Sequence, residues 1–293
     1  MERKSRKVSI WLCVLLMSIM AQNILLSDFE RTAGPYVPSP DVVVEKMLEM
    51  ADPGPDDFLI DLGSGDGIIV LTAAKRYKTR GLGVEIDPEL VELSNKRAKS
   101  MGIEDLVHFE VRDLFETDIS SATIVTTYLL PCIMEKLRPK LFNEPPCGAR
   151  VISHDYHVQE WPADDETTME VPEKEDIMGE PEATVYLWIV PARVAGEWEI
   201  KIEDGREMTL DIWQTYQLVD GIIEIEGLEH ELSEAKLRGT ELFFSLTVDG
   251  VNMAFSGIVD GINLEGKLII DEDEEELSWS AEKISSTYIY GSE

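Results

Sequence analysis

Short apolar runs alternate with helical patterns over the first two thirds of the chain. A helix with Ser39 as its N-cap and Pro40 in its first turn is expected to reach Ala51, because apolar residues recur at helical spacing. Further helices are predicted over 68–77, 88–101 and around 134–141. Buried strands are predicted at 58–60, 82–85, 107–111, 123–130, 149–153 and 184–190. This alternation predicts an α/β fold with a doubly wound, mainly parallel sheet covered on both faces.

Two later stretches depart from this alternation. Residues 160–182 are acidic and contain prolines, which predicts a loop or an irregular insertion. From Gly196 onward, polar and apolar residues alternate between Asp-Gly pairs, a pattern typical of β-hairpins. The pairs stand at 204–205, 220–221, 249–250 and 260–261. We therefore expect an α/β domain over 28–192 and a C-terminal antiparallel β barrel or sandwich over 193–293.

The N-terminus joins a basic start to an apolar run. Residues 2–7 are mostly basic, and residues 8–21 are apolar, with weaker apolar character continuing through Leu26. This predicts a signal peptide or membrane anchor over 1–27, cleaved near Ala21 or retained as roughly 19 residues that barely span a bilayer. Basic residues before the run favour export of the rest of the chain. We expect the protein to be membrane-associated or exported.

Composition narrows the range of partners. The net charge of −32 argues against nucleic acid, because phosphate binding needs clusters of Lys and Arg. The negative electrostatic field of the chain is compatible with a basic protein substrate. The acidic residues can also simply keep the protein soluble. The three cysteines, Cys13, Cys132 and Cys147, form no metal motif or even disulfide framework, and the four histidines are scattered. No metal site is expected.

A glycine-rich segment follows the first predicted strand. Gly63, Gly65 and Gly67 stand between that strand and a helix, where missing side chains let the backbone turn tightly and approach a ligand. Asp61 precedes them, and Glu85 ends the next strand, where its carboxylate can accept both hydroxyls of a ribose. The spacing therefore predicts a nucleotide site.

Two kinds of nucleotide compete for this site. The usual dinucleotide loop is Gly-x-Gly-x-x-Gly, and its helix N-terminus holds a pyrophosphate. Here the order is Gly-x-Gly-x-Gly, flanked by Asp61 and Asp66. S-adenosylmethionine carries an ammonium and a sulfonium and no phosphate, so acidic residues attract it. We therefore favour S-adenosylmethionine and a methyltransferase over a dehydrogenase or a purely structural glycine turn.

Asp113 and Leu114 follow the third predicted strand. Asp113 is placed to accept a hydrogen bond from the adenine amino group, and Leu114 to line the ring. Asp113 can instead cap a helix in the Leu114 region. Both interpretations stay open.

The motifs at 61–67, 83–85 and 112–114 resemble those of class I S-adenosylmethionine-dependent methyltransferases. More narrowly, the chain resembles the mitochondrial-type lysine methyltransferases that modify ATP synthase subunit c and the adenine nucleotide carrier, and their bacterial relatives. The segments that carry this narrower resemblance are 35–39, 129–131, 135–137, 148–153 and 161–162. The similar region runs from Pro35 to Trp161 and leaves the β-rich tail unexplained.

The resemblance implies a Rossmann-like, seven-stranded methyltransferase sheet and N-methylation of a lysine in a protein, including a membrane-embedded one. It implies that Tyr128 to Pro131 border the methyl group, with Tyr128 as the catalytic residue that orients the nitrogen. Asp155 and His154 are candidates for removing the proton. The cofactor-binding residues expected from motifs and resemblance are Tyr36, Pro38, Asp61, Gly63, Ser64, Gly65, Gly67, Glu85, Asp113 and Leu114. Simple packing stays an alternative for the Tyr and Pro positions.

Other functions stay open. One is methylation of a small molecule. Another is a binding module whose β domain recognises an envelope component while the methyltransferase fold is idle, although the intact glycine loop counts against idleness. Export also conflicts with a methyl donor that is made inside cells.

Overall fold

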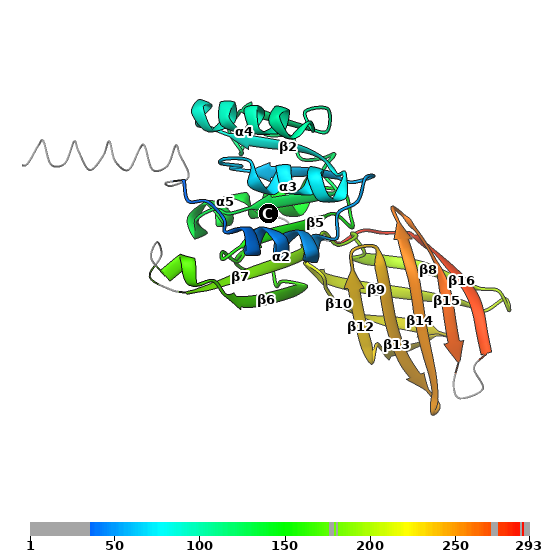
Figure 1. The fold of residues 1–293 in the computed structure, drawn as a ribbon. Coiled ribbons are helices and arrows are strands. Elements are labelled where there is room, and N and C mark those ends of the chain that lie inside the picture. Colours follow the sequence, from blue (N-terminus) through cyan, green and yellow to red (C-terminus); the bar gives the residue numbers. More distant parts are fainter. Residues whose placement is uncertain (1–35, 176–178, 180, 271–274, 288, 290–293) are drawn as a thin grey trace, which may run out of the picture. The chain divides into compact units, whose positions relative to one another are not determined.

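The computed structural model describes residues 36–175, 179, 181–270, 275–287 and 289 (Figure 1). The predicted signal peptide or anchor, residues 1–27, lies outside this range. No helix among the described residues has both the length and the apolar character needed to cross a bilayer. Ser39–Glu293 forms one compact unit.

Seven strands form the first sheet, in the order β3-β2-β1-β4-β5-β7-β6. The first five strands are parallel, and β7 runs antiparallel to both β5 and β6. The strands are β1 (Phe58–Leu62), β2 (Arg80–Glu85), β3 (Val107–Val111), β4 (Ile124–Thr127), β5 (Arg150–His154), β6 (Asp165–Glu170) and β7 (Glu182–Ile189). The predicted doubly wound, seven-stranded sheet is confirmed.

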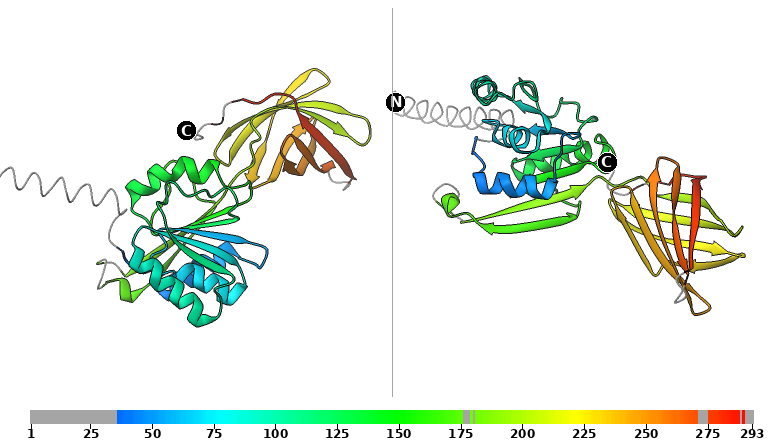
Figure 2. Two further views of the ribbon diagram at one scale, coloured as in Figure 1. Left: turned by 90° about the horizontal axis from the view of Figure 1, so that it is seen from above. Right: turned by 45° about the vertical axis from the view of Figure 1, so that its right-hand side comes forward.

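Helices cover both faces of this sheet. They are α2 (Asp41–Ala51), α3 (Ile68–Tyr77), α4 (Pro88–Met101), α5 (Pro131–Asn143) and the short 3-10 helix η1 (Pro172–Lys174). The apolar sides of α2, α3 and α4 share one core, while α5 lies across the sheet from α3 and α4 (Figures 1 and 2). Helix α4 shows why its bounds were predictable, because Asp87 Oδ1 accepts from Glu89 N and Gly102 ends the helix in the left-handed conformation.

Two predictions about these elements are wrong. Ser39 does not cap α2, which begins after Pro40 without a side-chain cap. Its hydroxyl bonds instead to His154 Nδ1 at 2.9 Å. The insertion predicted to be irregular contains β6, which pairs along its whole length with β7. Because most side chains of β6 are exposed and polar, its sequence carries no apolar signal for a strand.

Nine strands form a second, antiparallel sheet, in the order β11-β10-β9-β8-β16-β15-β14-β13-β12. They are β8 (Gly196–Ile202), β9 (Glu207–Thr215), β10 (Leu218–Ile225), β11 (Leu228–Glu231), β12 (Glu234–Arg238), β13 (Glu241–Val248), β14 (Val251–Asp260), β15 (Asn263–Ile270) and β16 (Glu275–Lys283). Inward-facing residues such as Trp198, Phe244 and Phe255 form a core separate from that of the first sheet.

The second sheet is rolled into a half-barrel. Its two edge strands, β11 and β12, follow one another in sequence and are joined by Leu232 and Ser233. Because so short a link spans roughly 10 Å, the end of β11 and the start of β12 must lie close together. The predicted antiparallel domain is confirmed, as one rolled sheet. Asp220-Gly221 is not a turn, since Gly221 pairs with Ile212 inside the β9–β10 ladder.

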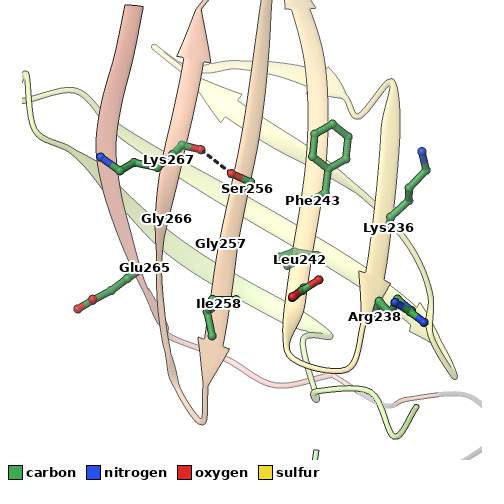
Figure 3. Close-up of a pocket in the computed structure, with 11 residues that line it drawn as sticks. Lys236, Arg238, Leu242, Phe243, Ser256, Gly257, Ile258, Glu265, Gly266 and Lys267 are labelled. Carbon is green, nitrogen blue, oxygen red and sulfur yellow. Dashed lines mark hydrogen bonds between the residues drawn. The ribbon is translucent and has the colours of Figure 1, made fainter. Parts of the chain in front are cut away.

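A groove of 430 Å³ crosses the outer side of β12 to β15 (Figure 3). Gly257 and Gly266, which stand opposite each other on β14 and β15, line its middle. A Cβ at Gly257 would lie 2.5 Å from Leu264 Cδ2 and 2.9 Å from Glu265 O, so β15 leaves no room for a side chain there.

An aromatic cluster joins α5 to the β9–β10 hairpin. The Trp161 side chain is fully buried, and its Nε1 donates to Gln217 Oε1 at 3.1 Å. The Trp161 ring meets Phe142 edge to face at 5.2 Å and stacks on Tyr216 at 6.0 Å. These contacts bury large apolar area between the two sheets.

Candidate active site

The strand order of the first sheet places the site. Because β1 is flanked by β2 on one side and β4 on the other, the order reverses between β1 and β4. In open α/β sheets, ligands bind outside the carboxyl ends of the strands at this reversal. The glycine loop follows β1, Glu85 ends β2, Tyr128 follows β4 and Asp155 follows β5. The predicted residues from separate segments therefore meet at one edge.

The glycine loop is tied to the end of β2. The N–H groups of Gly63 and Ser64 both donate to Val84 O at 2.9 Å. Gly67 has a φ of 79°, and a Cβ there would lie 2.7 Å from the Phe109 ring. Only glycine fits this turn, which brings bare backbone to the ligand edge.

Glu85 is aimed at the loop by backbone donors. Its Oε2 accepts from Gly65 N at 3.0 Å, and its Oε1 accepts from Ile86 N at 2.7 Å and Asp87 N at 3.0 Å. A carboxylate oxygen has two acceptor sites, so Oε2 keeps one for a ligand hydroxyl. This orientation is compatible with the predicted contact to the ribose.

Asp61 is the buried carboxyl of the site. Its side chain is 2% exposed, and Thr126 Oγ1 donates to its Oδ1 at 2.7 Å. Burial raises the pKa of Asp61 to about 7. The Thr126 hydrogen bond lowers this pKa, and the charges of Glu85 and Asp66 raise it by smaller amounts. The second predicted carboxylate is already paired, since Asp66 Oδ2 lies 2.5 Å from Arg97 NH1. Asp61 is thus the carboxyl left for a cationic ligand.

Two buried hydroxyls at this edge lack partners. Ser64 Oγ and Thr127 Oγ1 make no hydrogen bond within the part of the chain that the structure describes. Buried polar groups without partners are uncommon in folded proteins. Ser64 was predicted, whereas Thr127 was missed because a threonine at a strand end carries no motif. Together with Glu85 and Asp61, these groups fit a ligand with hydroxyls and a positive charge.

Asp113 is exposed, and its Oδ1 accepts from Phe115 N at 2.8 Å. This bond closes a turn, and no helix begins there, so the interpretation as a helix cap is wrong. Leu114 is buried. Their contact with adenine stays a prediction.

Aromatic rings line the ends of β4 and β5. Tyr128 stacks on His154 at 3.9 Å and on Tyr156 at 6.0 Å. Burial, followed by the charge of Asp155, raises the pKa of Tyr128, so its phenol stays protonated and suits orientation of a nitrogen. Burial lowers the pKa of His154 to about 4, which makes this candidate a weak proton acceptor.

Asp155, the other proton-acceptor candidate, is held by two partners. Thr184 N donates to its Oδ1 at 3.0 Å, and Lys174 Nζ donates to its Oδ2 at 2.5 Å. Lys174 was not predicted, because it is a basic residue in an acidic insertion with no motif around it.

Three further predicted residues are Leu129, Tyr36 and Pro38. Leu129 is buried, and its Cδ2 lies 2.9 Å from where a Cβ of Gly63 would be, so the segment after β4 packs on the loop. Tyr36 and Pro38 precede the compact unit and are exposed. The role of Tyr36 and Pro38 in binding the cofactor stays a prediction.

Comparisons with known proteins show the family of this chain. The model of the ANTKMT methyltransferase domain matches residues 61–165. A protein-lysine N-methyltransferase of Saccharolobus islandicus is 40% identical over 157 residues, which are 53% of this chain and 93% of that protein. The adenine nucleotide translocase lysine N-methyltransferase of Mus musculus is 34% identical over 131 residues, 45% of this chain and 57% of that protein.

A crystal structure of an RNA methyltransferase from Salinibacter ruber with S-adenosyl-L-homocysteine is also similar. It is 47% identical, with a TM-score of 0.48, and the match covers 54% of this chain and 96% of that one. Since this chain spans nearly the whole Saccharolobus enzyme at 40% identity, the predicted resemblance is confirmed. The chain belongs to the S-adenosylmethionine-dependent protein-lysine N-methyltransferases related to the ANTKMT methyltransferase domain.

Proposed function

We propose that this chain binds S-adenosylmethionine across the ends of β1 and β2 and methylates the side-chain nitrogen of a lysine in another protein. The observation that carries the proposal is the orientation of Glu85 by three backbone N–H groups, one of them from Gly65. This arrangement holds the Glu85 carboxylate, the proposed hydrogen-bond acceptor for the ribose hydroxyls, against the glycine loop. The Saccharolobus and mouse relatives, both lysine methyltransferases, support the acceptor class.

S-adenosylmethionine supplies a methyl group that passes to the amine lone pair as its C–S bond breaks, leaving S-adenosylhomocysteine. The residues then have three tasks. Ionised Asp61 attracts the ammonium group of the donor, and the unpartnered hydroxyls of Ser64 and Thr127 hydrogen-bond to it. Tyr128 orients the acceptor nitrogen. Because a sulfonium is a good leaving group, alignment and exclusion of water supply most of the catalysis.

The net charge separates acceptor classes. At −32, the chain repels RNA and attracts lysine-rich protein surfaces over distances near the Debye length. A protein acceptor is therefore favoured over a nucleic acid. A small cationic acceptor is the second candidate, since the same field attracts it.

Two experiments test the proposal. Calorimetry with S-adenosylmethionine measures donor binding, and Gly65→Arg should abolish the heat because its side chain would fill the loop. Transfer of labelled methyl to a whole-cell extract that contains protein, RNA and small molecules, followed by mass spectrometry, identifies the acceptor. Label on lysine residues is expected, and label confined to low-mass products or to RNA would contradict the proposal.

We further propose that the protein works at a membrane. The support is the basic start and apolar run of residues 2–21. Fractionation of cells that express the full chain, compared with a chain starting at Asp28, tests this. Equal distribution of both chains in the soluble fraction would count against membrane association.

A further inference from the structure

Lys174 is a buried lysine beside the proposed acceptor site. It ends η1 and is 5% exposed, and its Nζ donates to Asp155 Oδ2 at 2.5 Å and to Glu182 O at 2.6 Å. Lysine is almost never fully buried unless its charge is paired. Residue 174 lies beyond 165, where the match to the ANTKMT domain ends, so the family match does not account for it.

The carboxylate that Lys174 contacts is fixed in place. Asp155 has a φ of 62°, a left-handed conformation that is uncommon for residues other than glycine. Such a conformation persists where surrounding contacts impose it. Here Thr184 N and Lys174 Nζ hold one oxygen each. About a sixth of the Asp155 side chain, 16%, is exposed, which leaves it within reach of a bound amine.

The groups around Asp155 are mostly uncharged at neutral pH. Burial, followed by the charge of Asp155, raises the pKa of Tyr128 and of Tyr156. Burial and then Glu166 raise the pKa of Tyr186, which also faces this carboxylate. His154, whose Nε2 lies 3.4 Å from Asp155 Oδ2, is neutral because burial lowers its pKa. Among the described residues, Lys174 is thus the cation that balances Asp155 at the end of β5.

We propose that Lys174 is the internal counter-ion of Asp155 and keeps this carboxylate from holding an acceptor lysine as an ammonium ion. This inference rests on the proposed function. An amine forms the new C–N bond only through its lone pair, so its proton must first leave to water. A carboxylate beside an amine favours the charged, unreactive form. Pairing with Lys174 keeps Asp155 from stabilising the protonated amine. Asp155 still accepts its hydrogen bond from Thr184 N in β7.

The first test needs no turnover. Calorimetry measures binding of n-butylammonium, which mimics a lysine side chain, to the full chain saturated with S-adenosylhomocysteine. Lys174→Met and Lys174→Gln should bind it at least tenfold more tightly than the wild type, because Asp155 is then unpaired. Lys174→Gln keeps a hydrogen-bond donor, so it serves if the Met variant unfolds. The gain should vanish in D155N/K174Q.

The controls separate this role from a structural one. Lys140→Met removes a lysine of α5 that is paired with Glu144 at 2.8 Å, away from Asp155, and should leave butylammonium binding unchanged. Lys174→Arg keeps the charge and should behave as the wild type. If both neutral variants bind butylammonium like the wild type, the counter-ion role is overturned. Absence of S-adenosylhomocysteine binding would instead defeat the proposed function.

A second readout is the pH dependence of methyl transfer to Nα-acetyl-lysine amide. In Lys174→Gln the rate should fall at neutral pH and recover about one pH unit higher than in the wild type, since an unpaired Asp155 favours the protonated acceptor. A rate lowered equally at every pH, with lower thermal stability, would show that Lys174 acts only on the fold.

Discussion

Thr126 donates a hydrogen bond of 2.7 Å to Asp61 from the directly neighbouring position of the parallel strand β4. The bond favours the ionised carboxylate, but burial has the larger effect, and the pKa of Asp61 lies at about 7. Asp61 therefore changes charge within the physiological range, at the place where we propose that a cationic methyl donor binds.

Binding of S-adenosylmethionine should tighten about tenfold between pH 6 and pH 8. With a pKa near 7, the ionised fraction of Asp61 rises from about 0.1 to about 0.9 over this range. Calorimetry at the two pH values measures the change. Asp61→Asn should bind more weakly and lose most of the pH dependence. Equal affinity of the wild type at both pH values would show that Asp61 does not face the donor.

The stability of the ligand-free protein should respond to pH in the opposite sense. The pKa of Asp61 rises from an ordinary 3.8 to about 7 on folding, so the folded state binds the proton more tightly. Its contribution to stability is full below pH 4 and is lost as pH rises to 7, by up to ~1.4 kcal/mol per pH unit. Urea unfolding at pH 5, 6, 7 and 8 should show Asp61→Asn gaining stability relative to the wild type until pH 7. A constant difference would contradict the raised pKa.

Gly67→Ala should abolish donor binding and destabilise the fold. Its Cβ would lie 2.7 Å from Phe109 and 2.9 Å from Ser94, and its φ of 79° disfavours a side chain. Gly102→Ala is the matched control, because Gly102 also has a positive φ, of 67°, but nothing within 4 Å of the new Cβ. That control should lose about 1 kcal/mol of stability and bind the donor normally. Normal donor binding by Gly67→Ala would show that the loop is not the site.

Glu85→Gln should weaken S-adenosylmethionine binding by about 10- to 100-fold. The loss follows from a charge-assisted bond to the ribose, worth about 1.5–3 kcal/mol. Glu92→Gln, at an exposed residue of α4 that pairs with Lys96 at 2.6 Å, should bind as the wild type. Calorimetry on both variants makes the comparison, and equal affinities would remove Glu85 from the site.

Trp161→Ala should cost about 3–5 kcal/mol of folding free energy. The substitution empties a fully buried position and leaves Gln217 Oε1 without its donor. Trp213→Ala, at a β9 residue that is 50% exposed, should cost less than about 1 kcal/mol. Denaturant unfolding compares the two variants. If Trp161→Ala lost as little folding free energy as Trp213→Ala, the aromatic cluster between α5 and the β9–β10 hairpin would contribute little to stability.

Most of the first sheet was predictable, because its central strands are buried apolar runs and α4 has residues typical of helix ends. Phe58–Leu62 reads as a continuous apolar run up to Asp61, and Asp87 and Gly102 mark both ends of α4. The edge strand β6 was not predictable, since its polar side chains face solvent. The turn predicted at Asp220-Gly221 was wrong because both residues pair with β9. The β9–β10 hairpin turns at Tyr216 and Gln217 instead.

The site was predictable only as far as motifs reach. Gly63 to Gly67 and Glu85 could be predicted because the spacing of the glycines and the place of Glu85 at the end of a strand are visible in the sequence. Asp66 shows the limit, because its pairing with Arg97 depends on how α4 packs against the loop. Lys174 shows it again, since a contact with Asp155 across 19 residues leaves no periodic trace in the sequence.

The link at Leu232 and Ser233 has a consequence for how the protein behaves among other chains. Leu232 N donates to Gly221 O in β10, and Ser233 N donates to Ser245 O in β13. The link itself therefore bonds to a strand near each edge of the sheet. An open sheet of this size would present two rows of backbone donors and acceptors to passing strands and so invite aggregation. In this sheet the link holds the end of β11 beside the start of β12, so a passing strand has less access to both edges at that point.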